Sequence, residues 1–330
     1  MKKILVTGGA GYIGSFMVRE LKNKGFDVVI LDNLSQGHKE SVKDFRLEQI
    51  DLVTEKDKLD TFLKEEKFDG VVHMASFIQM GESFTNPAKY YKNNVGGFIN
   101  LLDSLREAGT NKIIVSSSAG VYGNPSKVPI EEIDPKNPLN PYGETKYIME
   151  RMLEDYDEAY GIKFMAIRYF NAAGANLDGN IGEDHPEESH LIPNIIKKAL
   201  ASEEIEIFGK DYDTPDGTCI RDYIHVLDLT ETHSMAMQRL LDGQKSNIYN
   251  AGIGRGYSNK EVLEMVKSVT GLTLNVKYVE RRPGDAGALY ASIDKIKKDF
   301  SWEPKYGLKE IIESAYAWHK KYPRGYAKIV

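Results

Sequence analysis

The sequence has little cysteine and no long apolar run. Cys219 is its only cysteine, so no intrachain disulfide can form, which fits a reducing compartment. We expect Cys219 to pack in the interior. No apolar stretch approaches the roughly 20 residues that a membrane helix needs, and glycines interrupt the apolar N-terminal run before it reaches signal-peptide length. These absences exclude a disulfide scaffold and a membrane-spanning protein, and they make the cytoplasm the expected location.

An excess of basic charge is also missing. The 330 residues include 43 Lys+Arg against 49 Asp+Glu, and no basic stretch is long enough to follow a nucleic-acid backbone. We therefore expect no nucleic acid among the partners. An anionic ligand must instead be bound by a few placed cations and backbone amides. The share of hydrophobic residues, 41%, is ordinary for a globular protein, and the length predicts two lobes or one enlarged α/β domain.

Short β-branched runs alternate with longer amphipathic stretches in the first half of the chain. The runs predicted as strands are Lys3–Thr7, Asp27–Asp32, Arg46–Asp51, Gly70–His73, Lys112–Ser116 and Lys163–Arg168. Strands and helices at this spacing predict a doubly wound parallel sheet that binds ligands at the carboxyl ends of its strands. The two longest helical patterns follow Asn86-Pro87 and Asn140-Pro141, each an N-cap residue followed by proline at the first helical position.

The composition of the chain and the length of its predicted elements change after about Gly174. Loops rich in Gly, Asp and Pro then separate shorter helices and strands. We predict a first domain over 1–174 and a smaller mixed α/β domain over 175–330 that shapes a substrate pocket. The run Ser246–Ala251 is predicted to be a strand that rejoins the main sheet, so the boundary between the domains need not be clean.

A glycine-rich turn follows the first predicted strand. Gly8, Gly11 and Gly14 open a helix, and because glycine has no Cβ, a pyrophosphate can approach the amides of that helix's N-terminus. Asp32 ends the second strand at about the spacing where a carboxylate accepts hydrogen bonds from the adenine ribose and repels a 2′-phosphate. The glycines alone would indicate an ordinary tight turn. Together with the strand, the helix and Asp32, they predict a Rossmann domain that binds NAD rather than NADP.

Tyr142 and Lys146 lie four residues apart on the helix that follows Pro141, so both side chains emerge on one face. A phenol with a pKa of about 10 is a poor base at neutral pH, but a nearby ammonium and a positively charged nicotinamide ring favour the phenolate. A strand ending in Ser116-Ser117-Ser118 places hydroxyls at the same sheet edge, and Ser118 is our candidate to bind a substrate oxygen. Judged alone, these residues would be a packed ring, a solvated lysine and turn serines. Their union with the glycine turn predicts acid–base chemistry.

These motifs together resemble the extended short-chain dehydrogenase/reductases, and among them the UDP-glucose 4-epimerase family. The resemblance spans nearly the whole chain, through Asp32-Asn33-Leu34, Val72–Ala75, Gly81–Ser83, Asn93–Val95, Ser116–Ala119, Tyr142–Lys146, Arg168–Asn171 and Arg221–His225. It implies that a hydride passes from sugar C4 to tightly held NAD while Tyr142 takes the hydroxyl proton, assisted by Lys146 and Ser118. The 4-keto sugar then turns about its diphosphate link and takes the hydride back on its other face. UDP-glucose and UDP-galactose interconvert without net redox.

The resemblance also implies two sets of contacts. Those to NAD come from Gly8, Gly11, Tyr12, Ile13, Gly14, Asp32, Asn33, Asp51, Leu52, Met74, Ala75, Asn94, Ser116, Tyr142, Lys146 and Tyr169. Those to the UDP-sugar come from Ser118, Tyr142, Asn171, His190, Leu191, Phe208, Arg221, Arg282, Asp285 and Leu289. The arginines are expected to make charge-assisted hydrogen bonds to the diphosphate, although Arg282 judged alone would be a solvated loop charge. A homodimer is implied as well, with the helices near Pro87 and Pro141 pairing as a four-helix bundle.

Some positions depart from the family's pattern. Ile78-Gln79 stand where some members carry a cofactor-binding lysine, Phe16 stands where histidine is common, and His190 stands where an asparagine often contacts the sugar nucleotide. Leu289 lies where residue size is thought to decide whether N-acetylated sugars enter, and leucine leaves that question open.

Three alternative functions remain. A 4-epimerase of another UDP-sugar, whether an N-acetylhexosamine, a pentose or a uronate, would share the catalytic residues. A sugar-nucleotide 4,6-dehydratase is disfavoured because Ala119-Gly120 stand where that family uses an Asp-Glu pair. A non-catalytic NAD sensor is disfavoured because Ser118, Tyr142 and Lys146 are all present.

Carboxylates and imidazoles gather in the run Gly182–His190. The run lacks regular helical ligand spacing, and the proposed chemistry needs no Lewis acid. We therefore predict a solvated lid there, and no metal.

Overall fold

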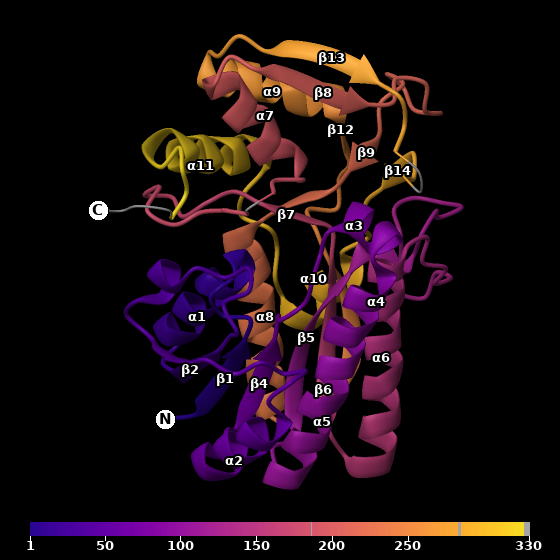
Figure 1. The fold of residues 1–330 in the computed structure, drawn as a ribbon. Coiled ribbons are helices and arrows are strands. Elements are labelled where there is room, and N and C mark those ends of the chain that lie inside the picture. Colours follow the sequence, from indigo (N-terminus) through magenta and orange to yellow (C-terminus); the bar gives the residue numbers. More distant parts are fainter. Residues whose placement is uncertain (186, 283–284, 327–330) are drawn as a thin grey trace. The chain divides into compact units, whose positions relative to one another are not determined.

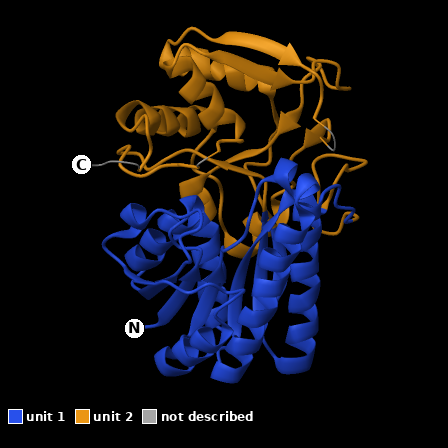
Figure 2. Cartoon of the chain, in the orientation of Figure 1, with its two compact units in different colours: residues 1–121, 136–168, 230–249 blue, residues 122–135, 169–229, 250–330 orange. Residues whose placement is uncertain are grey.

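The structure is a computed structural model, and it describes residues 1–185, 187–282 and 285–326. It contains two compact units that interleave along the chain (Figures 1 and 2). Unit 1 comprises 1–121, 136–168 and 230–249, and unit 2 comprises 122–135, 169–229 and the described residues from 250 onward. The predicted division at 174 is a single cut. In the structure the chain instead crosses between the units several times.

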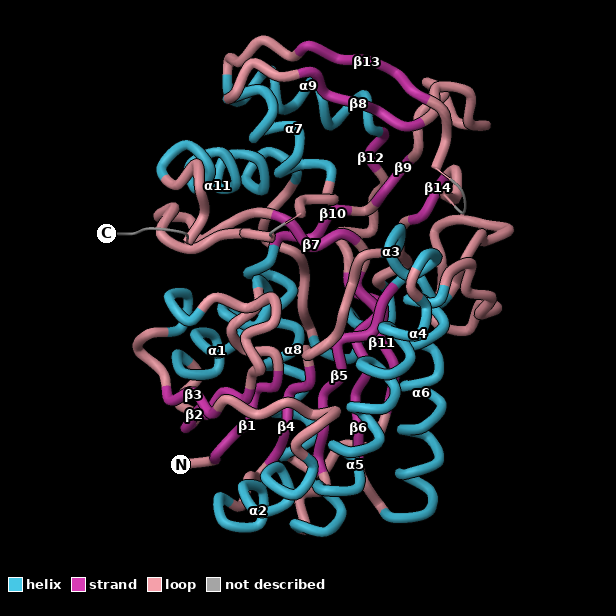
Figure 3. Tube along the Cα trace, in the orientation of Figure 1, coloured by secondary structure: helices cyan, strands magenta, loops and turns pink. Residues whose placement is uncertain are grey.

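A seven-stranded sheet with the order β11-β6-β5-β4-β1-β2-β3 organises unit 1 (Figure 3). Its strands are β1 (Lys3–Thr7), β2 (Asp27–Leu31), β3 (Arg46–Glu48), β4 (Gly70–His73), β5 (Lys112–Ser118), β6 (Lys163–Tyr169) and β11 (Asn247–Ala251). All the predicted strands are confirmed, including the one that rejoins the sheet late in the chain. Thr7 is in parallel register with both Leu31 and His73, so the carboxyl ends of β1, β2 and β4 meet at one edge of the sheet.

The helical segments of unit 1 are α1 (Tyr12–Asn23), η1 (Lys39–Val42), α2 (Lys56–Glu66), α3 (Met80–Thr85), α4 (Pro87–Tyr90), η2 (Tyr91–Gly96), α5 (Gly97–Ala108), η3 (Ala119–Val121) and α6 (Pro141–Tyr160). The predicted start of α6 is confirmed, because the side chain of Asn140 accepts a hydrogen bond from the Gly143 amide at 2.8 Å.

The other predicted helix start is wrong in part. Within the described residues, Asn86 makes no side-chain cap, and the segment after Pro87 is α4, a π-helical turn (η2) and then α5. Asn94 lies inside the π-helical turn, fully buried and hydrogen-bonded outside its own helix, to Phe77 and Thr145. A π-turn admits such an inserted residue, and it occurs often at functional sites.

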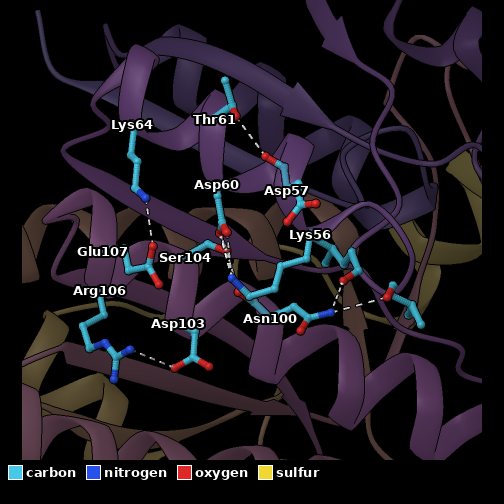
Figure 4. Close-up of polar contacts among 12 residues, drawn as sticks. Lys56, Asp57, Asp60, Thr61, Lys64, Asn100, Asp103, Ser104, Arg106 and Glu107 are labelled. Atoms are coloured by element: carbon cyan, nitrogen blue, oxygen red, sulfur yellow. Dashed lines mark hydrogen bonds and ion pairs between the residues drawn. The ribbon is translucent and has the colours of Figure 1, made fainter.

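Helices α2 and α5 pack against each other with a polar margin (Figure 4). Lys64 pairs with Glu107 at 2.8 Å, the Asp60 carboxylate accepts from Ser104, and the Asn100 side chain donates to the Leu52 carbonyl at 2.8 Å. The Lys64–Glu107 pair is about half exposed, so it adds little to stability. The fully buried apolar residues Leu59, Leu63, Phe98, Leu101 and Leu105 of these two helices belong to one hydrophobic core cluster.

Unit 2 contains helices and small sheets of two or three strands, and this mixed α/β composition was predicted. Its elements are β7 (Asn171–Ala173), α7 (Leu191–Leu200), β8 (Glu204–Phe208), β9 (Ile220–Arg221), β10 (Tyr223–His225), β12 (Tyr257–Ser258), α9 (Asn259–Thr270), β13 (Asn275–Val279), β14 (Ala288–Leu289), α10 (Asp294–Phe300) and α11 (Leu308–Lys321), and α8 (Val226–Leu241) runs from it into unit 1. Its sheets are β10-β7, β12-β9-β14 and β13-β8. Apolar faces of α7, α9 and α11 form one core through residues such as Ile196, Val262 and Ile312.

Cys219 is buried, as predicted. Among the residues that the structure describes, no helix is both long enough and apolar enough to cross a bilayer.

Candidate active site

The glycine turn of unit 1 has no room for side chains at two positions. Gly8 has a φ of +71°, and a Cβ there would lie 2.5 Å from the Ala75 amide nitrogen. A Cβ at Gly14 would lie 2.1 Å from the Gly8 carbonyl oxygen. Helix α1 begins directly after Gly11, and no described side chain caps it. The turn therefore offers helix N-terminal amides to an anionic group, which is what the pyrophosphate of a dinucleotide requires.

Asp32 is held rigidly at the end of β2. Its carboxylate is buried and accepts hydrogen bonds from the amides of Ala10 at 2.9 Å and Leu34 at 2.8 Å. Burial raises the pKa of Asp32, whereas the two amide hydrogen bonds oppose that shift. Nearby, Asn33 donates to Asp51 at 2.7 Å. The predicted adenosine-binding residues Asp32, Asn33 and Asp51 thus lie at one corner of the sheet, beside the glycine turn.

Lys146 is the buried cation at the centre of the predicted acid–base group. It is 2% exposed, and its ammonium donates to Ser76 Oγ and to the Ser116 carbonyl oxygen, both at 2.8 Å. Burial lowers the pKa of Lys146 to about 7, against the opposing charge of Glu150. Ser116 is itself fixed, because its hydroxyl lies 3.0 Å from His233 Nε2. The ammonium is therefore oriented by groups on β5 and in the loop after β4.

Tyr142 is buried beside Ser118, where the first turn of α6 meets the end of β5. The Ser118 hydroxyl accepts a hydrogen bond from the Gly120 amide at 3.1 Å, and it also bonds to Tyr142. A Cβ at Gly143 would lie 2.6 Å from the Gly120 carbonyl oxygen. The backbone of α6 therefore lies directly against the backbone that follows β5, with no side chain between them. This close approach brings the phenol to the serine.

The expected effect of Lys146 on Tyr142 is not reproduced by the protein's own groups. Burial raises the pKa of Tyr142, and the hydrogen bond with Ser118 opposes the shift without reversing it. The Lys146 Nζ atom lies 6.0 Å from the centroid of the tyrosine ring and directs its hydrogen bonds to Ser76 and Ser116. The protein's own groups therefore do not lower the pKa of Tyr142, and the expected contribution of a bound nicotinamide ring stays a prediction.

Sequence reasoning missed the groups that support Lys146. The Glu150 carboxylate accepts from Ser117 Oγ at 2.5 Å and forms a two-point ion pair with Arg168, at 2.9 and 2.6 Å. Both side chains of the pair are 2% exposed. Glu150 lies one turn beyond Lys146 on the same buried face of α6, so an acidic residue at that helical spacing was the available signal. Ser76 had no comparable signal.

Asn94 connects the loop after β4 to α6. Its side chain accepts from the Phe77 amide at 2.9 Å, donates to the Phe77 carbonyl oxygen at 3.1 Å, and donates to Thr145 Oγ1 at 3.0 Å. Thr145 lies on α6 between Tyr142 and Lys146. The structure therefore places Asn94 as a brace for the acid–base helix. Of the departures noted above, Phe16 is buried and packs edge-on against Tyr12.

In unit 2, the predicted diphosphate-binding residues form local pairs. Arg221 on β9 is opposite Leu289 of β14 in the parallel register, and its guanidinium lies 3.5 Å from the Asp285 carboxylate. The Arg282 guanidinium stacks 3.9 Å from the centroid of Phe208, which ends β8. A guanidinium stacked on a ring keeps its in-plane N–H donors directed outward, where an anion can accept from them.

The other predicted substrate contacts in unit 2 lie on β7 and at the start of α7. Asn171 donates from its side chain to the Asp222 carbonyl oxygen at 2.8 Å. His190 precedes Leu191, the first residue of α7, and its Nδ1 lies 2.5 Å from Glu183 Oε1. Tyr169, a predicted NAD contact, ends β6 and is half-buried.

The prediction of a solvated lid over Gly182–His190 is wrong. The side chains of Glu183 and Glu188 are only 3% and 6% exposed, and the indole of Trp318 donates to the Glu183 carbonyl oxygen at 2.9 Å. Burial lowers the pKa of His185, but the neighbouring carboxylates of Glu183 and Glu188 outweigh it and raise that pKa to about 10. The loop is packed on α11, which the sequence pattern did not show. Pro186 lies outside the described residues.

With this geometry in place, similarity to known proteins decides the family. The profile of the NAD dependent epimerase/dehydratase family matches residues 4–252. The chain belongs to this family. The matched region contains the glycine turn, Tyr142, Lys146 and Arg221, and it ends before Arg282 and Asp285, which the full-length relatives below also cover.

Members of this family resemble the chain over nearly its whole length. It is 46% identical to the UDP-glucose 4-epimerase of Lactobacillus helveticus, over 98% of this chain and 99% of that protein. The crystal structure of UDP-glucose 4-epimerase from Brucella ovis in complex with NAD has a TM-score of 0.92 at 42% identity, covering 96% of this chain and 98% of that one. The UDP-Glc/GlcNAc 4-epimerase from Campylobacter jejuni has a TM-score of 0.85 at 40% identity, covering 97% and 100%.

Proposed function

We propose that this member of the epimerase/dehydratase family is an NAD-dependent UDP-glucose 4-epimerase, which interconverts UDP-galactose and UDP-glucose. The observation that carries the proposal is the buried Tyr142 beside the half-buried Ser118, at the carboxyl edge of a sheet whose first strand leads into the glycine turn. The full-length similarity to UDP-glucose 4-epimerases supports the choice of substrate.

The residues of unit 1 fit NAD. Gly8, Gly11 and Gly14 keep the turn open for the pyrophosphate, with Tyr12 and Ile13 supplying amides of the first turn of α1. Asp32 binds the adenine ribose with a carboxylate whose position two amides already fix. The remaining proposed contacts in unit 1 are Asn33, Asp51, Leu52, Met74, Ala75, Asn94 and Ser116, and Tyr169, which belongs to unit 2, is proposed as one more. The chemistry that NAD supplies when bound is the acceptance and return of one hydride at sugar C4, and its cationic ring favours the Tyr142 phenolate.

Tyr142 moves the proton. Its phenolate oxygen takes the C4 hydroxyl proton as the hydride leaves, and the resulting phenol returns that proton when the hydride comes back to the opposite face. Ser118 holds the same sugar oxygen by a hydrogen bond, and its effect on the pKa of Tyr142 supports this role. Lys146 links the loop that carries Ser76 to β5 through its two hydrogen bonds, and it adds positive charge when protonated. Because the pKa of Lys146 is about 7, its charge changes near neutral pH.

Unit 2 holds the UDP while the sugar turns. Arg221 and Arg282 bind the negatively charged diphosphate. These local cations are needed because the formal net charge of the protein is itself negative, at -6. Arg221 is partly exposed and Arg282 is exposed, so both can donate to a ligand. The other proposed UDP-sugar contacts are Asn171, His190, Leu191, Phe208, Asp285 and Leu289.

An N-acetylated UDP-hexose is a second candidate substrate. Leu289 is half-buried in β14 opposite Arg221, and its side chain is smaller than a tyrosine. The similarity to the UDP-Glc/GlcNAc 4-epimerase of Campylobacter jejuni supports this activity.

We further propose a homodimer through α5 and α6. Tyr156 of α6 donates to Asp103 of α5 at 3.0 Å, so the two helices form one surface. Tyr91 in η2 is 38% exposed and Ile99 of α5 is 41% exposed, apolar groups that a partner would cover. Molar mass by light scattering tests the dimer. The cytoplasm is the proposed location, and the single, buried thiol of Cys219 supports it.

The deciding experiment supplies purified protein with UDP-galactose and no cofactor, and separates the quenched products by anion-exchange chromatography. Formation of UDP-glucose is expected, because hydride returned within each cycle needs only bound NAD. A parallel reaction with UDP-N-acetylgalactosamine tests the second substrate. Absence of UDP-glucose even after NAD is added would overturn the proposed function.

A further inference from the structure

Four potential metal ligands converge in the loop before α7. Glu183, His185, Glu188 and His190 each offer one ligand atom, and these atoms all lie within 4.8 Å of one another. The four side chains are 3%, 14%, 6% and 39% exposed, respectively. Three of these four side chains are largely buried, which distinguishes the group from a solvated acidic patch, because buried charges need compensation.

Three distances within this His–Glu cluster fall in the range of tetrahedral edges, and the two that involve Glu188 reach different oxygens of its carboxylate. His185 Nδ1 lies 3.3 Å from Glu183 Oε1 and 3.6 Å from Glu188 Oε2, and His190 Nδ1 lies 3.6 Å from Glu188 Oε1. At zinc–ligand distances of about 2.0–2.2 Å, the edges of a tetrahedron measure about 3.3–3.6 Å. The pair His190 Nδ1 and Glu183 Oε1, at 2.5 Å, would separate by about 1 Å to admit the ion.

One carboxylate oxygen in the cluster accepts no hydrogen bond within the part of the chain that the structure describes. Glu188 Oε2 is buried, and none of the described residues gives it a hydrogen bond, although His185 Nδ1 is 3.6 Å away. The protonated His185 balances the charge of this oxygen when no ion is bound but lies too far away to donate a hydrogen bond, so a lone pair of Glu188 Oε2 stays open to a metal ion. A divalent ion with two carboxylates and two neutral imidazoles forms a complex of zero net charge, which suits a buried position.

The backbone around the cluster is fixed before any ion binds. The His190 amide donates to Glu188 Oε1 at 2.9 Å, and the Asn194 side chain donates to the Glu188 carbonyl oxygen at 3.1 Å. The Trp318 indole holds the Glu183 carbonyl oxygen. These contacts tie the loop to α7 and α11, so little conformational freedom is lost on binding an ion.

We propose that Glu183, His185, Glu188 and His190 bind one divalent transition-metal ion, with Zn²⁺ as the best fit to this ligand set. Imidazole ligands favour such ions over Mg²⁺ and Ca²⁺, and a four-coordinate site filled by protein is structural rather than catalytic. Both histidines bind through Nδ1 as neutral imidazoles, so binding releases any protons that they carry. His190 Nε2 stays available for the sugar-nucleotide contact proposed above. The metal site uses none of the acid–base residues and does not depend on the proposed reaction.

The test begins with tag-free protein that has been treated with a chelator, dialysed and titrated with Zn²⁺. Mass spectrometry of metal content is expected to give one zinc per chain, and the melting temperature is expected to rise with Zn²⁺ but not with Mg²⁺. His185→Gln and Glu188→Gln should each weaken zinc binding by more than about 100-fold, since even changes to supporting groups weaken metal binding by 10- to 100-fold.

Glu187→Gln is the matched control, because Glu187 is exposed and is not one of the four ligands. It should bind zinc like the wild type. If His185→Gln or Glu188→Gln fails to fold, Co²⁺ added to wild-type protein decides, since tetrahedral Co²⁺ gives intense visible absorption that an octahedral ion lacks. A folded wild-type protein that takes up no stoichiometric zinc overturns the proposal, and so does a Glu188→Gln variant with unchanged affinity.

Discussion

Lys146, Glu150 and Arg168 of unit 1 are each no more than 2% exposed, whereas Arg221 of unit 2 is 15% exposed at its side chain and Arg282 is exposed. The first three are hydrogen-bonded to protein groups at 2.6–2.9 Å. The Arg221–Asp285 separation of 3.5 Å is looser. Unit 1 thus fixes its charges by contacts within the protein, as the proposed proton transfer demands, and unit 2 keeps exposed donors for the proposed diphosphate ligand.

The largest expected effect concerns the buried acid–base residues of unit 1. Tyr142→Phe removes the proton acceptor and keeps the ring, so kcat should fall by about 10²- to 10⁴-fold. Bound NAD, measured by its absorbance after denaturation, and UDP affinity should be unchanged. Tyr147→Phe, on the same helix, is the control and should retain activity. Near-normal turnover in the Tyr142 variant would remove the tyrosine from the mechanism.

The next effect concerns stability. Arg168→Met leaves the buried Glu150 carboxylate without its cation, and the free energy of unfolding should fall by about 3–5 kcal/mol. The midpoint of urea unfolding at saturating NAD measures this change. Lys64→Met breaks the exposed Lys64–Glu107 pair in Figure 4 and should leave the midpoint unchanged. Equal losses in the two variants would contradict the contrast between buried and exposed pairs.

A smaller effect is expected for the exposed arginines of unit 2. Arg282→Gln removes a charge-assisted hydrogen bond, so the KM for UDP-galactose should rise by about 10- to 100-fold with kcat little changed. Its neighbour Arg281 already pairs with Asp211 at 2.8 Å and stacks on Tyr212. Arg281→Gln should therefore leave KM near the wild-type value. A larger KM change for Arg281 than for Arg282 would reverse the proposed roles.

The smallest effect is a change in pH dependence. Burial raises the pKa of Asp222 to about 7, although its carboxylate accepts from the amides of Ile253, Gly254 and Ala291. Because the folded-state pKa exceeds the unfolded one, the stabilising contribution is complete below about pH 4 and is lost as the pH rises through about 7. The melting temperature should therefore fall less between pH 5 and pH 8 in Asp222→Asn than in wild type. An unchanged slope would show that Asp222 does not titrate there.

The features that sequence predicted are local ones. Gly8, Gly14 and Asp32 follow directly from strand ends, and Tyr142 and Lys146 follow from helical spacing. The strands were predictable because alternating patterns within a few residues determine them.

The features that sequence did not predict depend on distant partners. Glu150 lies 18 residues from Arg168, and the burial of the Glu183 loop depends on Trp318, 135 residues away. The interleaved units have the same cause, since the crossings follow from long-range packing. Propensity within a short window carries no information on such contacts.

The close approach of Gly143 to Gly120 has a consequence for variation in this chain. Position 143 lies between Tyr142 and Lys146, and even a methyl group there would meet the Gly120 carbonyl at 2.6 Å. The helix would have to withdraw from β5, carrying the phenol away from Ser118. A residue with no side chain thereby sets the spacing of the proposed proton-transfer pair, so we expect a substitution at Gly143 to lower activity even though every reactive group stays intact.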